Sequence, residues 1–129
     1  MTDEVERVFS PDERPVLDFR LSPEEAEALR RELVSRGAFV AALQLTIADD
    51  EEDLLRLLAH AAHLPLSFAG NWDAVGECLL DVEAFGESKG FVVLLAGSMT
   101  PGFDKLAEAI VAAGPHWAEA GRFTRLVLT

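Results

Sequence analysis

The chain has 129 residues, of which 50% are hydrophobic, so it can form one domain with its own core and is not expected to be disordered. Its 11 Lys and Arg against 23 Asp and Glu give a formal net charge of −12, which disfavours binding to nucleic acid or to an anionic membrane surface. A basic protein is the partner that such a charge attracts. The single cysteine, Cys78, excludes an internal disulfide and a cysteine zinc cluster.

No apolar stretch reaches the length of a membrane span, and the acidic start at Met1–Glu4 is not followed by the apolar core of a signal peptide. We therefore expect a cytoplasmic protein that does not bind membranes. Gly97 and Gly102 lack the spacing of the glycine-rich loops that bind phosphates. No cofactor is expected.

Residues 1–37 are expected to form an extension that packs on the rest of the chain. Its first 14 residues are charged and predict an arm or an edge element that packs loosely. Residues 16–19 fit a short strand. The run Ser22-Pro23-Glu24-Glu25 predicts a helix start, because it offers a capping serine, a proline at the first helical position and a glutamate that completes a capping box. Gly37 is placed to end that helix.

Residues 38–47 form a nearly continuous apolar run, which predicts a strand buried on both faces. Five acids at 49–53 then precede a helical apolar pattern, and we expect that helix to run to about His63 because negative charge suits a helix N-terminus. Spacings of three and four predict the buried stripe of the next helix, formed by Trp72, Val75, Leu79 and Val82.

The rest of the chain adds strands at 91–95 and 123–128. Between them, Thr100-Pro101 predicts a helix start and Gly114-Pro115 an interruption, with Phe103, Leu106, Ile110 and Val111 turned inward. Helices that alternate with apolar strands predict an α/β fold with a parallel sheet. We expect about three strands in a small sheet, plus an extra N-terminal strand if residues 16–19 join it.

The most unusual feature of the sequence is an acidic stretch without compensating bases. From Leu57 to Ser88 there is no Lys or Arg, whereas Asp73, Glu77 and Asp81 follow one another at intervals of four. That spacing predicts three carboxylates on one face of a helix. They could form a solvated polar face, an anionic surface for a cationic partner, a metal site, or an acid–base pair. A single helical stripe projects outward rather than converging, which argues against the metal.

The histidines and the cysteine offer no further chemistry. His60 and His63 are spaced as two ligands on a helix, but no third ligand can be named. Cys78 lies beside Leu79 and is expected to be buried and inert. We therefore expect neither a catalytic nor a metal-binding residue.

Residues 64–79 read Leu-Pro-Leu-Ser-Phe-Ala-Gly-Asn-Trp-Asp-Ala-Val-Gly-Glu-Cys-Leu. This segment resembles the barstar family of ribonuclease inhibitors, which shares Leu-Pro, an aromatic and a small turn residue, then Asn, an apolar residue, Asp-Ala, an acid, Cys and Leu. The resemblance covers residues 38–129, and the order of the predicted elements there also matches.

The resemblance implies a three-stranded parallel sheet with helices packed on it. It also implies an inhibitor, not an enzyme, which inserts an acidic helix and the preceding loop into the active site of a basic, extracellular-type ribonuclease. There the acids take the place of the RNA phosphates. Such a protein is expected to act as a monomer.

The resemblance assigns partner-binding roles residue by residue. Asp73 matches the first inhibitory aspartate of the family, and Glu77 stands where another aspartate is typical. Ser67 replaces a contact tyrosine, Phe68 keeps the neighbouring aromatic, and Gly76 replaces a tryptophan. A late acid of the family falls at His116, with Glu119 nearby. The full set of expected contact residues is Ser67, Phe68, Gly70, Asn71, Asp73, Gly76, Glu77, Asp81, His116 and Glu119.

Two other functions stay open at this point. The same scaffold could bind a different basic protein, such as a toxin or a regulator. A small hydrolase could use Asp73, Glu77 and a histidine.

Overall fold

A computed structural model describes residues 2–10, 13–44, 51–64, 72–96 and 102–129. Helices and strands alternate along most of the chain. In order they are α1 Thr2–Phe9, β1 Val16–Asp18, α2 Pro23–Ser35, β2 Phe39–Gln44, α3 Glu51–Ala61, α4 Trp72–Leu80, the short 3-10 helix η3 Val82–Phe85, β3 Gly90–Ala96, α5 Phe103–Glu119 and β4 Phe123–Leu128.

The four strands form one sheet in the order β1-β4-β3-β2, and every neighbouring pair is parallel. In the N-terminal strand β1, Val16 pairs with Leu126 of β4, so residues 16–18 do join the sheet. The predicted α/β fold with a small parallel sheet is confirmed, and the sheet has the extra N-terminal strand.

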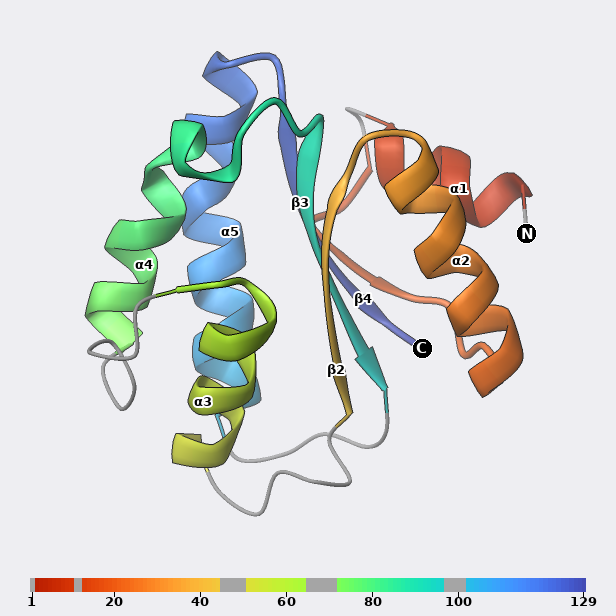
Figure 1. The fold of residues 1–129 in the computed structure, drawn as a ribbon, viewed down its shortest axis with the longest axis horizontal. Coiled ribbons are helices and arrows are strands. Elements are labelled where there is room, and N and C mark those ends of the chain that lie inside the picture. The colour runs from red at the N-terminus through yellow and green to blue at the C-terminus, as the bar shows by residue number, and fades with distance from the viewer. Residues whose placement is uncertain (1, 11–12, 45–50, 65–71, 97–101) are drawn as a thin grey trace.

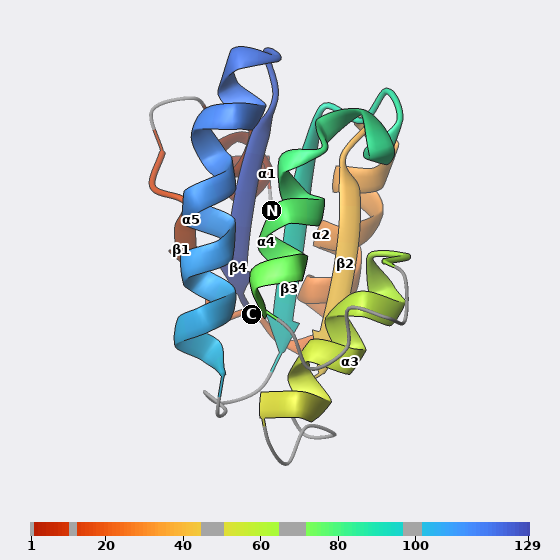
Figure 2. The same ribbon diagram turned by 90° about the vertical axis from the view of Figure 1, so that its left-hand side faces the viewer.

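Helices cover both faces of this sheet and make three layers (Figure 1). The α1–α2 layer lies on one face, and α3, α4 and α5 lie on the other, as the turned view also shows (Figure 2). Hydrophobic side chains form a core on each face of the sheet: the first core lies between the sheet and α3–α5, and the second between the sheet and α1–α2. Strand β3 contributes to both cores because its side chains alternate between the two faces. Phe91, Val93 and Leu95 pack towards α3–α5, whereas Val92 and Leu94 pack towards α1 and α2.

The expected start of α2 is confirmed in detail. The Ser22 hydroxyl accepts a hydrogen bond from the Glu25 backbone N–H at 3.2 Å, and the Glu25 carboxylate accepts one from the Ser22 N–H at 3.0 Å. Leu29 and Leu33 then point into the second core. Residues 1–37 therefore add strand β1 to the sheet that residues 39–128 build, and their helices α1 and α2 pack on one face of it.

The expectation of a loosely packed arm at residues 1–14 is wrong over its first part. Residues 2–9 form α1, and its Val5 and Val8 are completely buried in the second core. These two valines lie three positions apart, so a single helical turn brings both onto the sheet.

Strand β2 is not buried on both faces, as the apolar run had predicted. It is an edge strand, and its Ala42 and Gln44 side chains are exposed. Residues 45–47 of the predicted strand lie outside the described residues.

The predicted interruption of the last helix is also wrong. Helix α5 continues through Pro115. A residue before proline usually avoids helical geometry because its Cβ meets the ring, and Gly114 has no Cβ. The buried stripe continues as Leu106, Ile110, Ala113 and Trp117, whereas Val111 is 47% exposed instead of turned inward. The predicted start at Thr100-Pro101 lies outside the described residues.

Within the parts of the chain that the structure describes, no helix combines the length and the apolar character needed to cross a membrane.

Candidate functional site

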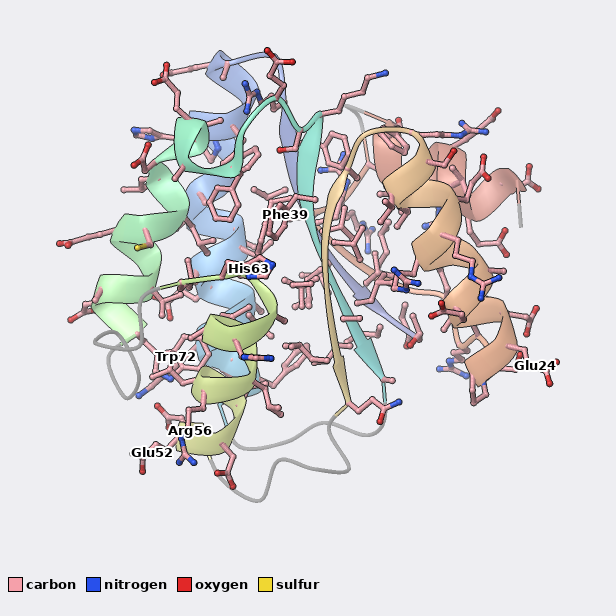
Figure 3. The ribbon with its side chains drawn as sticks, viewed as in Figure 1. Glu24, Phe39, Glu52, Arg56, His63 and Trp72 are labelled. Atoms are coloured by element: carbon pink, nitrogen blue, oxygen red, sulfur yellow. The ribbon has the colours of Figure 1, made fainter. Side chains whose placement is uncertain are left out.

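Helix α4 divides its residues between the core and solvent. Val75 and Leu79 are fully buried against α5 and the sheet, which turns Asp73 and Glu77 outward, where both are exposed. Trp72 is partly buried and packs on the same core at the start of the helix, near α3 (Figure 3). The predicted buried stripe is thus confirmed for Val75 and Leu79, and Trp72 belongs to its edge.

Asp81 lies just beyond the end of α4, so only Asp73 and Glu77 of the three predicted carboxylates belong to the helix. Helix α4 ends at Leu80, and Asp81 has φ −83° and ψ 79°, outside the helical region. Val82 begins the 3-10 turn η3 and is buried there. The spacing of four therefore falls within one helix only for the first two acids.

A groove of about 900 Å³ runs between α4 and α5 beside these acids. Asp73, Gly76 and Glu77 line it from α4. A Cβ added at Gly76 would meet no atom within 4 Å, so the groove is open at this point. Its α5 side carries Glu108 and His116 together with small residues, namely Ala109, Ala112 and Ala113.

Lys105 of α5 and Glu51 of α3 also line this groove and pair with each other. The Lys105 ammonium lies 2.6 Å from the Glu51 carboxylate, and that hydrogen bond raises the pKa of the lysine. Among the described residues, neither Asp73 nor Glu77 forms an ion pair. Asp73 and Glu108 also raise the pKa of Lys105 by their charge, but the closest partner of this lysine is Glu51.

Two acids of α2, on the far side of the sheet, are paired with arginines in contrast. Glu27 lies 2.6 Å from Arg30 and 3.3 Å from Arg31, and Glu32 lies 3.0 Å from Arg36. The hydrogen bond from Arg30 lowers the pKa of Glu27 to about 2. The sequence places bases at helical spacing on α2 and none on α4, so the negative charge of the molecule is concentrated on the α4 side.

A second cavity of about 560 Å³ lies on the other side of α4 and is mostly apolar. Phe39, Leu64 and Phe85 contribute to it, and Glu77, Cys78 and Asp81 face it from α4 and the residue that follows. Cys78 is only partly buried, which corrects the expectation of a fully buried thiol. Burial, followed by the charges of Asp81 and Glu77, raises the pKa of this thiol, which lowers its fraction of reactive thiolate.

The structure brings together some of the expected contact residues and not others. His116 lines the α4–α5 groove with Asp73, Gly76 and Glu77, whereas Glu119 is exposed at the end of α5 and does not line it. Ser67, Phe68, Gly70 and Asn71 lie outside the described residues. Glu108, which sequence reasoning missed, lies in the groove, and its place two turns before His116 on α5 is the signal that could have found it.

The described residues contain no group of three or more His, Cys, Asp or Glu side chains that could hold a metal ion. His60 and His63 are both exposed at the end of α3, and the His63 ring meets Phe39 edge-on with 6.1 Å between centroids. Figure 3 shows His63 and Phe39 facing one another across the space between α3 and β2.

Fold and site together define a small α/β protein that presents an acidic helix at its surface. Comparison with known families matches residues 38–129 to the family Barstar (barnase inhibitor), and the chain belongs to this family. Searches among curated proteins and among solved structures gave no match. The family membership confirms the resemblance that the sequence of residues 64–79 had indicated.

Proposed function

We propose that this protein inhibits a basic ribonuclease by laying the outer face of α4 over the phosphate-binding active site of the enzyme. The observation that carries the proposal is the pair of exposed carboxylates, Asp73 and Glu77, which have no ion-pair partner among the described residues. Membership of a family described as barnase inhibitors supports it. Like charges four residues apart destabilise a helix, and a basic partner would offset that cost.

The chemistry of such a contact follows from the cations that hold RNA phosphates. An arginine can form two charge-assisted hydrogen bonds to one carboxylate, as it does to a phosphate. The open groove beside Gly76 gives a basic side chain of the enzyme access to Asp73, Glu77 and Glu108. We further propose that the protein acts as a monomer, in the cytoplasm of the cell that makes an extracellular-type ribonuclease, and that it has no hydrolytic activity of its own.

The experiment is an RNA cleavage assay with a purified barnase-type ribonuclease and increasing amounts of this protein. The parent protein is expected to abolish cleavage, and the protein alone is expected to leave RNA intact. Asp73→Asn and Glu77→Gln are each expected to weaken binding by about 2–5 kcal/mol, because the enzyme's cation is then buried without its partner. Truncating one partner of a buried, hydrogen-bonded charge pair in a protein interface generally costs this much.

Glu24→Gln is the matched control because it removes the same charge from the exposed start of α2, on the opposite side of the molecule (Figure 3). It should inhibit like the parent. Inhibition that is equally weakened by Glu24→Gln and by the two α4 variants would refute a specific role for α4. Uninhibited cleavage in the presence of excess parent protein would refute the function for that enzyme.

A further inference from the structure

The C-terminal end of α4 lacks the local features that usually stabilise a helix end. A helix C-terminus carries a partial negative charge and is stabilised by nearby cations. The last turn of α4 contains no basic residue, and Asp81 follows it directly. Asp73 and Glu77 add repulsion along the outer face. The position of this helix must therefore be fixed by contacts from elsewhere in the fold.

Two donors from the end of α5 and the turn that follows it supply those contacts. The Trp117 indole Nε1 donates a buried hydrogen bond of 2.8 Å to the Leu79 carbonyl in the last turn of α4. The Arg122 guanidinium donates to the Gly86 carbonyl at 2.7 Å and to the Val82 carbonyl at 3.4 Å, at the two ends of η3. The C-terminal end of α5 and the turn η3 lie at the same end of the sheet (Figures 1 and 2).

We propose that Arg122 is a positioning residue for the acidic helix, and that Trp117 supports it. By holding η3, the guanidinium fixes the end of α4, so that Asp73 and Glu77 meet the partner already in place. Binding by a preorganised surface avoids the entropy loss of ordering it in the complex. The proposal rests on the proposed function, because it assumes that α4 is the binding surface.

The charge of Arg122 makes this role distinguishable from an electrostatic one. Without Arg122 the molecule is one unit more negative, so its long-range attraction to a basic enzyme would grow and association would become faster. A positioning role predicts the opposite effect on the complex, which should become weaker because it dissociates faster.

The test compares Arg122→Met with Lys89→Met by stopped-flow kinetics against a barnase-type ribonuclease. Lys89 is exposed, close to the end of η3 in the chain, and its stem lies beside Gly37 rather than α4, so this variant loses the same charge without a contact to the helix. We expect dissociation to become about tenfold faster for Arg122→Met, the scale of losing hydrogen bonds from a charged donor. Lys89→Met should dissociate like the parent.

A conservative variant separates positioning from general destabilisation. Arg122→Lys keeps a cation and a donor near the same carbonyls and is expected to recover most of the loss. Equal dissociation rates for Arg122→Met and Lys89→Met would overturn the proposal. An Arg122→Lys variant as weak as Arg122→Met, at equal thermal stability, would also overturn it.

Amide hydrogen exchange in the free protein keeps the proposal testable if no ribonuclease binds. Failure of the parent to bind would count against the proposed function alone. Faster exchange of residues 79–86 in Arg122→Met, with unchanged exchange in Lys89→Met, would still support the positioning role. Unchanged exchange in both variants would contradict it.

Discussion

Gly76 and Gly90 show how differently two glycines of one chain can be constrained. A Cβ at Gly76 would enter open space in the α4–α5 groove. A Cβ at Gly90 would lie 2.5 Å from the ring of Phe123, its neighbour across the sheet. That ring is held by Phe9 at 5.1 Å between centroids and by the guanidinium of Arg125 at 5.2 Å, so it has little room to yield.

Gly76→Ala is expected to stabilise the protein by about 0.5–1 kcal/mol, because glycine inside a helix costs roughly that much relative to alanine. Urea unfolding followed by circular dichroism measures the change. A loss of stability would show that the added methyl group meets other atoms of the protein, and that the groove is not open to solvent at this position.

Gly90→Ala is expected to destabilise the protein by about 1–3 kcal/mol, the usual result of overpacking a filled site. The same urea titration applies, and the opposite signs of the two Gly→Ala variants provide the internal control. Equal changes in the free energy of unfolding for the two variants would contradict the close packing of the Phe123 ring on Gly90.

At the scale of single elements, α2 illustrates a helix whose stability depends on pH. The pKa of Glu27 is about 2 in the folded protein against an ordinary value of 4.5, because Arg30 donates to its carboxylate. A carboxyl group with a depressed pKa stabilises the fold above pH 4.5 and loses that contribution as the pH falls towards 2.

The thermal midpoint of the parent should therefore exceed that of Glu27→Gln at pH 7, and the difference should shrink as the pH falls from about 4.5 to 2. Thermal unfolding of both proteins across this pH range measures it. The effect is expected to be small, since the pair is exposed to solvent. A difference that is constant with pH would show that the pair does not form in solution.

The elements that could be predicted from sequence are those whose signals are local. The capping box of α2 and the alternation of apolar strands with helices depend on neighbouring residues, and both were confirmed. Helix α1 depends on contacts with distant parts of the fold, which local patterns do not show. Helix α5 passes through Pro115 because Gly114 precedes it, and a rule that treats every proline as a helix break misses this.

The candidate site was predictable to a similar degree. The spacing of Asp73 and Glu77 predicted two exposed carboxylates on one helix, and the resemblance at residues 64–79 indicated the family. Helix α4 ends at Leu80, one residue before Asp81, and no spacing rule reveals where a helix ends without a cap. Helical spacing puts Glu108 on the face of His116, but the packing of α5 on α4 is what makes that face line the groove.

At the scale of the whole molecule, the extension at residues 1–37 and the rest of the chain share one sheet. Leu33 of α2 and Leu79 of α4 are both fully buried, on opposite faces of that sheet. Each Leu→Ala substitution is expected to cost about 2–5 kcal/mol.

Both variants are expected to unfold in a single cooperative transition, because the two cores share the strands between them. Calorimetry and the fluorescence of the two tryptophans, Trp72 and Trp117, should give the same midpoint. Two separated transitions, with Leu33→Ala shifting only the first, would show that residues 1–37 are an independent unit.

The net charge of −12 leads to a second expectation at this scale. The Debye length falls from about 10 Å at 0.1 M to about 3 Å at 1 M ionic strength, so association with a basic ribonuclease should slow markedly over that range. Dissociation should change less, since it depends on the short-range pairs. An association rate that is flat with salt would contradict electrostatic attraction to a basic partner.

The central claim is that the carboxylates of α4 occupy the place of the RNA phosphates, and competition with a mononucleotide tests it most directly. The measurement is a calorimetric titration of this protein into a barnase-type ribonuclease, first with an empty active site and then with increasing concentrations of the mononucleotide. If α4 fills the phosphate site, the apparent Kd will rise in proportion to the nucleotide concentration once the site is saturated. A Kd that does not change with nucleotide, or the absence of binding to the empty enzyme, would contradict the account.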